Sequence, residues 1–206
     1  MTTIAIIAQK GGAGKTTLAL HLAAEAERAG RVALVVDTDP QASASQWGFW
    51  REGNPPEVID SPPALLARKV EQAKAMGAGF VIIDTPPHAD SAASMAAQLA
   101  DLLLIPCRPS ALDLHAIRLT ASLVASARKP AFVVFMGGSP NAPRLHDDAG
   151  EIVKGYGLDV CPVRIPERAA FRNAIGQGRV AYEIEPEGKA AHDVAALFDW
   201  VCKQAV

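Results

Sequence analysis

The chain has 206 residues, of which 50% are hydrophobic and 5% aromatic, and its formal net charge is −2 at pH 7. This length and composition predict one globular domain over residues 1–206 with a sizeable core. Bulk charge gives no support for binding to nucleic acid, so any such contact must come from a local basic patch. The sequence contains no apolar run as long as a membrane span, and it enters a strand-like run without a signal peptide.

The three cysteines are far apart and odd in number. Cys107, Cys161 and Cys202 form neither a C-x-x-C motif nor a plausible disulfide framework, which indicates a reducing compartment. We interpret all three as packing residues and expect a cytoplasmic protein.

Apolar runs alternate with helical stretches along the chain, which predicts an α/β fold with a mainly parallel twisted sheet and helices on both faces. The expected strands are residues 3–8, 32–37, 80–84, 101–106, 131–136 and 160–165. The expected helices are residues 15–29, 63–76, 89–99, 113–128, 145–155, 168–175 and 189–204. The stretch from Gln46 to Pro63 is the least regular part, and its Trp47 and Trp50 are expected to pack under a loop, with partner binding as the alternative.

A glycine-rich loop, residues 10–17, lies between the first expected strand and the first expected helix. This strand–loop–helix context is typical of a phosphate-binding loop, in which backbone N–H groups and the helix dipole face phosphate oxygens. Lys15 is expected to reach the β- and γ-phosphates, and the Thr16 hydroxyl to coordinate Mg²⁺. The loop residues expected to bind the nucleotide are Gly11, Gly12, Ala13, Gly14, Lys15, Thr16 and Thr17.

The loop departs from the usual G-x-x-x-x-G-K-[ST] pattern, because Gln9 stands where the first glycine is expected. A second lysine, Lys10, follows it. Since Lys15 occupies the inside of the loop, Lys10 is better placed to reach a phosphate across a subunit boundary. There it would stabilise transition-state charge in the manner of an arginine finger.

Three aspartates are expected beside this loop. Asp37 and Asp39 end one buried-type strand, and Asp84 ends another. Ligands of open α/β sheets sit at the carboxyl ends of the strands, where these three side chains would meet the loop. Carboxylates can surround a hydrated Mg²⁺ and orient an attacking water, so the pattern indicates a catalytic nucleotide site.

The chain resembles the ParA/MinD group of deviant Walker-motif ATPases. The matching motifs are K-G-G-x-G-K-T-T at 10–17, D-x-D-P-Q at 37–41 and I-I-D-x-P-P at 82–87, with weaker matches at 105–114, 165–166, 176 and 186–190. The likeness is greatest to short ParA-type partition ATPases. Because the loop begins at Lys10, we expect a single nucleotide-binding ATPase domain without an N-terminal helix-turn-helix extension.

The resemblance implies a P-loop NTPase fold with a deviant Walker A motif, binding of ATP or ADP with Mg²⁺, and weak ATP hydrolysis. Lys10 corresponds to the lysine that contacts nucleotide across an ATP-sandwich dimer, and Asp39 to the aspartate associated with water activation. The catalytic residues implied are Lys10, Lys15 and Asp39. The metal-site residues implied are Thr16, Asp37 and Asp84.

The base-binding side is less well defined. Pro166 belongs to the Ile165–Pro166 loop that usually borders the adenine in the family. Many relatives carry an Asn-Arg pair after the strand equivalent to 132–135, whereas this chain has Met136, Gly137 and Gly138 there. Selectivity for ATP over GTP therefore depends on the family resemblance and not on a visible side chain.

A local basic patch is the best candidate for contact with DNA, and the family likewise places non-specific DNA contacts on C-terminal basic residues. The patch consists of Arg164, Arg168, Arg172, Arg179 and Lys189. Arg168 and Arg172 are four residues apart, so on the expected helix they would share a face and follow one phosphate backbone. The alternative is a solvated face or salt bridges inside the fold.

The last expected helix is amphipathic, with Val194, Leu197, Phe198 and Val201 on one face and Lys203 as its only basic residue. Interfacial membrane helices usually carry several Lys or Arg residues, so core packing is favoured and no membrane contact is expected.

The resemblance implies an ATP-dependent homodimer that segregates or positions plasmid or chromosomal DNA. Its expected partners are non-specific DNA and a ParB/ParG-like adaptor protein, which would place it in the cytoplasm on the nucleoid. Two alternatives remain open: a positioning ATPase for a non-DNA cargo, and a metabolic ATP-dependent synthetase on the same scaffold.

Overall fold

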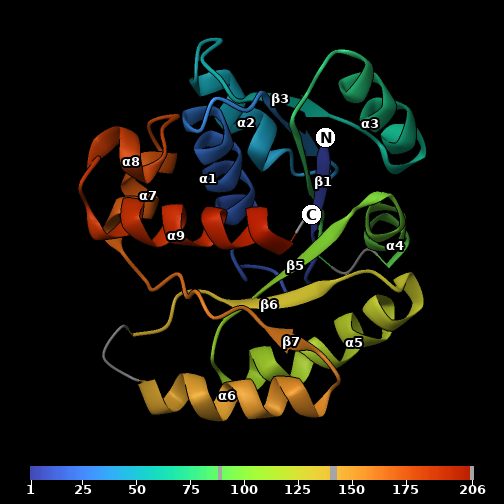
Figure 1. The fold of residues 1–206 in the computed structure, drawn as a ribbon, viewed down its shortest axis with the longest axis vertical. Helices are drawn as coiled ribbons and strands as arrows, with labels where there is room; N and C mark the ends of the chain where they lie inside the picture. Colours follow the sequence, from blue (N-terminus) through green and yellow to red (C-terminus); the bar gives the residue numbers. More distant parts are fainter. Residues whose placement is uncertain (88–89, 140–142, 205–206) are drawn as a thin grey trace.

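The computed structural model describes residues 1–87, 90–139 and 143–204. Within these ranges a seven-stranded sheet has the order β3-β2-β4-β1-β5-β6-β7, and all its pairings are parallel (Figure 1). The strands are β1 (Thr2–Ile6), β2 (Ala33–Asp37), β3 (Glu57–Asp60), β4 (Phe80–Asp84), β5 (Leu102–Cys107), β6 (Ala131–Phe135) and β7 (Asp159–Val160).

Helices cover both faces of this sheet. They are α1 (Lys15–Arg28), α2 (Ser43–Trp50), α3 (Leu66–Ala75), α4 (Asp90–Leu99), α5 (Ala111–Ala127), α6 (Pro143–Gly155), α7 (Ala169–Ile175), α8 (Ala181–Ile184) and α9 (Lys189–Gln204), with a 3₁₀ turn at Pro63–Leu65. Successive residues of a strand point to opposite faces, so Ile4 and Ile6 enter one core while Ala5 and Ile7 enter the other. The first core includes residues of α1, α2, α7, α8 and α9, and the second includes residues of α3, α4, α5 and α6. The predicted α/β fold with helices on both faces is confirmed.

The strand order positions the candidate site at β1. This strand pairs with β4 on one side and β5 on the other. Strands β2 to β4 are all added on one side of β1, and strands β5 to β7 are all added on the other side. Crevices at such switch points, outside the carboxyl ends of the strands, are the usual ligand sites of open α/β sheets. The loop before α1 follows β1 at this edge of the sheet.

Four elements differ from the sequence-based expectations. Helix α2 and strand β3 occupy the stretch predicted to be least regular, and α8 was not predicted. The last expected strand, 160–165, is reduced to β7 and a single bridge between Ile165 and Met136. Pro162 lies inside this stretch and has no N–H to donate, which interrupts the ladder.

The two tryptophans of α2 have different environments. Trp47 is fully buried, and its Nε1 donates to the Arg179 carbonyl oxygen at 3.1 Å, so its predicted role in packing is confirmed. Trp50 remains 45% exposed.

The predicted packing role of the C-terminal helix is also confirmed. Val194, Leu197, Phe198 and Val201 are buried in the core that α9 shares with α1. Among the described residues, no helix is long and apolar enough to cross a membrane. All three cysteines are free, and Cys107 and Cys161 are buried.

Candidate functional site

The phosphate-binding loop curls because two of its glycines adopt a backbone conformation that other residues rarely take. Gly12 has φ of 72° and Gly14 has φ of 99°, both in the left-handed region. Gly14 directly precedes α1 and provides no side-chain cap. The first N–H groups of α1 are therefore left to face a bound anion, as expected for a phosphate site.

Lys15 lies inside this curl. Its Nζ is 3.2 Å from the Ala8 carbonyl oxygen and 3.4 Å from the Lys10 carbonyl oxygen, and the residue is 7% exposed. Burial lowers the pKa of Lys15, while the charges of Asp84 and Asp39 raise it. An ammonium group held by backbone carbonyls in this position can bind the phosphate chain of a nucleotide.

Asp84, at the end of β4, has the properties of a metal-site residue. It is 1% exposed, and within the described ranges neither carboxylate oxygen accepts a hydrogen bond of full geometry, although the Thr16 side chain lies close enough to lower its pKa. Burial raises the pKa of Asp84 to about 7, with Asp37 and Asp39 adding to the rise while Thr16 and Lys15 oppose it. Buried carboxylate oxygens without partners are costly unless a cation or its water shell satisfies them, so the site fits a hydrated Mg²⁺ held by Thr16 and Asp84.

Asp37 lies beside Asp84, because the two residues are in register on the paired strands β2 and β4. Its carboxylate already accepts hydrogen bonds from the Asp39 N–H at 3.0 Å, the Ser45 N–H at 2.9 Å and the Ser45 hydroxyl at 3.2 Å. Asp37 therefore fixes the segment between β2 and α2, and through it the position of Asp39.

Asp39 is the more accessible carboxylate of this pair. It is partly exposed, and its Oδ1 accepts the Gln41 N–H at 2.9 Å, which closes a local turn. This turn fixes the carboxylate close enough to Lys15 and Asp84 for its charge to raise the pKa of both groups. The position suits a group that orients water at a terminal phosphate.

Lys10 points away from the inside of the loop. Its Nζ is 3.0 Å from Asp113 Oδ2 on α5, and the Lys10 side chain is 39% exposed while that of Asp113 is 7% exposed. The Ser110 hydroxyl donates to the same carboxylate. The two lysines of the loop therefore do not share one position, and Lys10 is held at the surface by a residue 103 positions further along the chain.

Asp113 is a residue of this site to which sequence reasoning assigned no role. It belongs to the weaker family match at 105–114, which was the available signal. Its contact with Lys10 depends on the packing of α5 and could not be read from local spacing.

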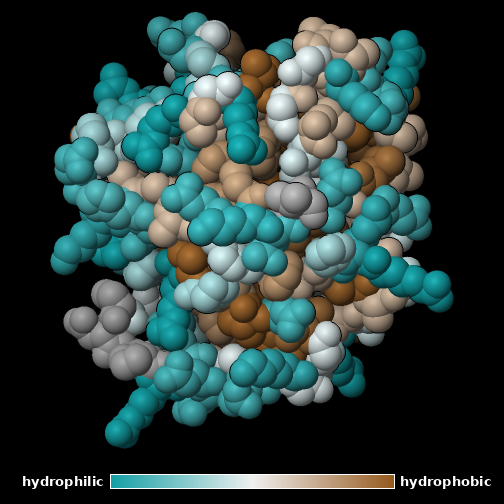
Figure 2. Space-filling model, in the orientation of Figure 1, coloured by the Kyte–Doolittle hydropathy of each residue, from teal (hydrophilic) through white to brown (hydrophobic). Residues whose placement is uncertain are grey.

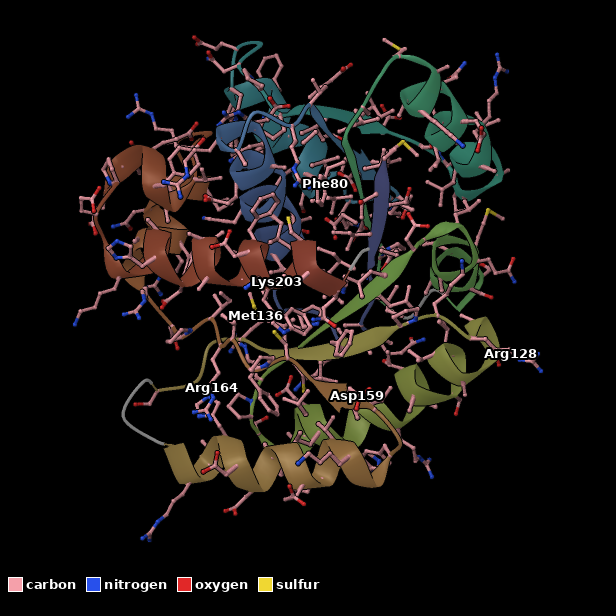
Figure 3. All side chains as sticks on the ribbon, viewed as in Figure 1. Phe80, Arg128, Met136, Asp159, Arg164 and Lys203 are labelled. Carbon is pink, nitrogen blue, oxygen red and sulfur yellow. The ribbon has the colours of Figure 1, made fainter. Side chains whose placement is uncertain are left out.

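The end of β6 and the segment around Pro166 lie next to the phosphate loop. Met136 pairs with Ile165, and the Gly137 N–H donates to the Ile165 carbonyl oxygen at 2.8 Å. Met136 lies near the end of β6 (Figure 3), where a Cβ on Gly14 would come within 3.0 Å of its Cε. Pro166 is thus close to the loop in space, although 152 residues separate it from Gly14.

The basic patch is not arranged as predicted. Helix α7 begins at Ala169, and Arg168 before it is extended, with φ of −138°. Arg168 Nε is 2.6 Å from Asp193 Oδ2 on α9, so the expected pairing of Arg168 with Arg172 on one helix face is wrong. Asp193 on α9 is 25 residues away along the chain, so this ion pair could not be read from the spacing of Arg168 and Arg172.

The other members of the patch differ in accessibility. Arg164 points toward α6, where its Nη2 is 3.2 Å from Asp147 Oδ1 (Figure 3). Arg172, Arg179 and Lys189 are exposed and form no side-chain ion pair with the described part of the chain. We call these three residues the exposed basic trio. Hydrophilic residues cover most of the surface over α7 and α8 (Figure 2).

A parallel sheet, a glycine-rich loop closed around a lysine, and buried carboxylates on adjacent strands define a P-loop nucleotide-binding protein. Residues 4–181 match the family described as the CobQ/CobB/MinD/ParA nucleotide binding domain, and the chain belongs to this family of P-loop ATPases.

Three similar proteins cover nearly the same length. The maintenance of carboxysome distribution protein A of Halothiobacillus neapolitanus is 30% identical, over 93% of this chain and 91% of that protein. Protein ParA of Rhizobium radiobacter is 33% identical, over 83% of this chain and 81% of that protein. The structure of MinD from Pyrococcus horikoshii complexed with Mg-ADP has a TM-score of 0.76 at 18% identity, covering 97% of this chain and 95% of that one. Nucleotide and Mg²⁺ are thus ligands within the family.

Proposed function

We propose that this protein is an ATP-dependent dimerisation switch that partitions plasmid or chromosomal DNA through non-specific DNA binding and a ParB/ParG-like adaptor. The observation that carries the proposal is the position of Lys10. It lies outside the phosphate-binding curl, is partly exposed, and is tied to the protein by one ion pair. A lysine placed there can reach the nucleotide of a second subunit after it leaves Asp113.

The chemistry is hydrolysis of ATP to ADP and phosphate. Mg²⁺ neutralises charge on the terminal phosphates when it is bound. Lys15 holds the phosphates from within the subunit, and Lys10 of the other subunit adds charge to the transition state. Asp39 orients the attacking water from its fixed turn. Basal turnover is slow in this proposal because ATP binding sets the dimer and hydrolysis resets it.

DNA contact rests on the exposed basic trio, with Arg164 and Arg168 in support. One subunit offers only a few phosphate contacts, since Asp147 and Asp193 neutralise two of the five basic residues. A dimer brings two trios together, so DNA affinity is expected only in the ATP-bound state. Such affinity should fall steeply with salt, because each neutralised phosphate releases a counterion.

A non-DNA cargo is the second candidate. It is favoured by the 30% identity, over 93% of this chain, to a protein named for maintenance of carboxysome distribution. In both cases the ATPase cycle is the same and the adaptor selects the cargo.

The test is binding of an unrelated DNA duplex in the presence of Mg²⁺ with either ATP or ADP. Wild type is compared with Arg172→Ala/Arg179→Ala, and Arg68→Ala is the matched control because Arg68 is an exposed arginine on α3. We expect binding with ATP only, loss in the double variant and no change in the control. Dimerisation with ATP but no DNA binding in any variant would favour the non-DNA cargo.

A further inference from the structure

Arg108 lies directly after β5, at the same edge of the sheet as the phosphate-binding loop. Strand β5 pairs with β6 in register up to Cys107 and Phe135, so Arg108 is next to the residues that follow β6. A Cβ on Gly137 would lie 3.7 Å from Arg108 Nε and 3.9 Å from its Cγ. The arginine side chain therefore passes over the α-carbon of Gly137.

The backbone of Arg108 is fixed while its charged end is free. The Ser110 N–H donates to the Arg108 carbonyl oxygen at 2.8 Å, and the Cys107 thiol also contacts this oxygen, at 3.3 Å. The residue is exposed, and its guanidinium forms no hydrogen bond or ion pair with residues 1–87, 90–139 or 143–204. An arginine anchored in this way presents a planar cation at this edge of the sheet.

The position of the phosphates determines where the rest of a nucleotide lies. Asp84 and Asp37 end β4 and β2, so the metal and the terminal phosphate belong on that side of β1. The nucleoside must extend to the opposite side, over β5 and β6. There the Met136 side chain lies where a Cβ on Gly14 would meet it, and Met136 pairs with Ile165.

Gly137 leaves the surface on this side open. It has φ of 71°, a conformation that glycine favours, and it carries no side chain of its own. The sequence therefore provides no side chain for the base at this position, two residues after the end of β6, and the guanidinium of Arg108 occupies the space instead.

We propose that Arg108 stacks on the nucleobase of bound ATP and ADP. A guanidinium plane packs well against an aromatic ring, and its charge adds a cation–π contribution. Every base has a π-face, so the contact strengthens binding of nucleotides without selecting adenine over guanine. The inference rests on the ATPase part of the proposed function and is independent of the cargo.

The experiment measures binding of ADP, GDP and pyrophosphate by calorimetry with Mg²⁺. Diphosphates are used because the proposed dimer forms only with ATP, so the assay reports the site of one subunit. We expect Arg108→Ala to weaken ADP and GDP equally, by about ten-fold, the usual size of a base-stacking contact, and to leave pyrophosphate unchanged. Arg108→Lys should lose most of the same affinity because it keeps the charge but not the plane.

Three results would overturn the proposal. An equal loss for pyrophosphate would place Arg108 on the phosphates. Full ADP affinity in Arg108→Ala would show that Arg108 does not contribute to nucleotide binding. Full ADP affinity in Arg108→Lys would show that the charge alone suffices and that the guanidinium plane is not needed. Arg68→Ala is the control for loss of surface charge, and pyrophosphate binding in each variant verifies that the loop is folded. DNA binding is not measured, so a failure of Arg108 is distinguishable from a failure of the DNA switch.

Discussion

Replacement of Lys10 by alanine separates the two roles that the structure gives this residue. Within the subunit, Lys10 neutralises the carboxylate of Asp113, and across a dimer it is proposed to contact ATP. Lys10→Ala removes both interactions. Lys10→Ala/Asp113→Asn also removes the carboxylate that Lys10→Ala leaves unpaired. The double variant therefore avoids the cost of an unpaired buried charge, but it still lacks the lysine that is proposed to contact ATP.

The size of the first effect follows from exposure. Breaking a fully buried ion pair from one side costs about 3–5 kcal/mol, whereas an exposed pair contributes about 0–1 kcal/mol. Lys10 is 39% exposed and Asp113 is 7% exposed, so we expect Lys10→Ala to lower the free energy of unfolding by roughly 1–2 kcal/mol. The double variant should recover most of this loss, because asparagine carries no charge to leave unpaired.

Sedimentation with ATP and Mg²⁺ measures the second role, and urea unfolding measures the first. Lys10→Ala and the double variant should both bind ATP and remain monomeric, whereas Lys15→Ala should lose ATP affinity itself. Asp113→Asn alone should dimerise more tightly than wild type with ATP. In this variant Lys10 does not have to break an ion pair before it contacts the ATP of the other subunit. A Lys10→Ala dimer as tight as wild type would refute the contact across subunits, and unchanged stability would refute the reasoning about Asp113.

Three further predictions concern hydrolysis, pH and the loop. Asp39→Ala should bind ATP and accumulate as a dimer, with ATP turnover reduced about ten-fold or more in a phosphate-release assay. Normal turnover in this variant would show that another group orients the attacking water. His21 is buried in α1, and burial lowers its pKa from 6.5 to about 4. Between these values the unfolded chain binds a proton that the folded chain does not, so stability falls as pH falls. Urea unfolding of His21→Gln from pH 7 to pH 4 should show a shallower decline than wild type, and an equal decline would show that His21 does not cause the pH dependence. Gly14→Ala should lower the free energy of unfolding by about 1–2 kcal/mol, because Gly14 has a positive φ and its new Cβ would meet Met136 Cε. Gly11→Ala is the control and should change the free energy of unfolding little, because there is open space around the Gly11 α-carbon. Equal stabilities of the two variants in urea unfolding would show that the loop relaxes around the new side chain.

Much of the candidate nucleotide site could be predicted because its parts are local in sequence. The residues of the phosphate loop are consecutive, and Asp37 and Asp84 each end an apolar strand. Parallel strands bring their carboxyl ends to one edge, so the meeting of these aspartates follows from the strand pattern. The elements that were missed, α2, β3 and α8, are short and lie among prolines and glycines, where local patterns are weak.

The sequence by itself therefore determined the parallel sheet apart from β3 and the extent of β7, the curl of the loop and the type of ligand, since each depends on hydrophobic periodicity or on glycines at fixed spacing. Only the tertiary structure decided which charged residues are available. Asp113 holds Lys10, Asp193 holds Arg168, and Arg108 passes over Gly137 without a partner in the described ranges. The physical reason is that an ion pair forms between side chains that packing brings within about 4 Å, whatever their separation along the chain.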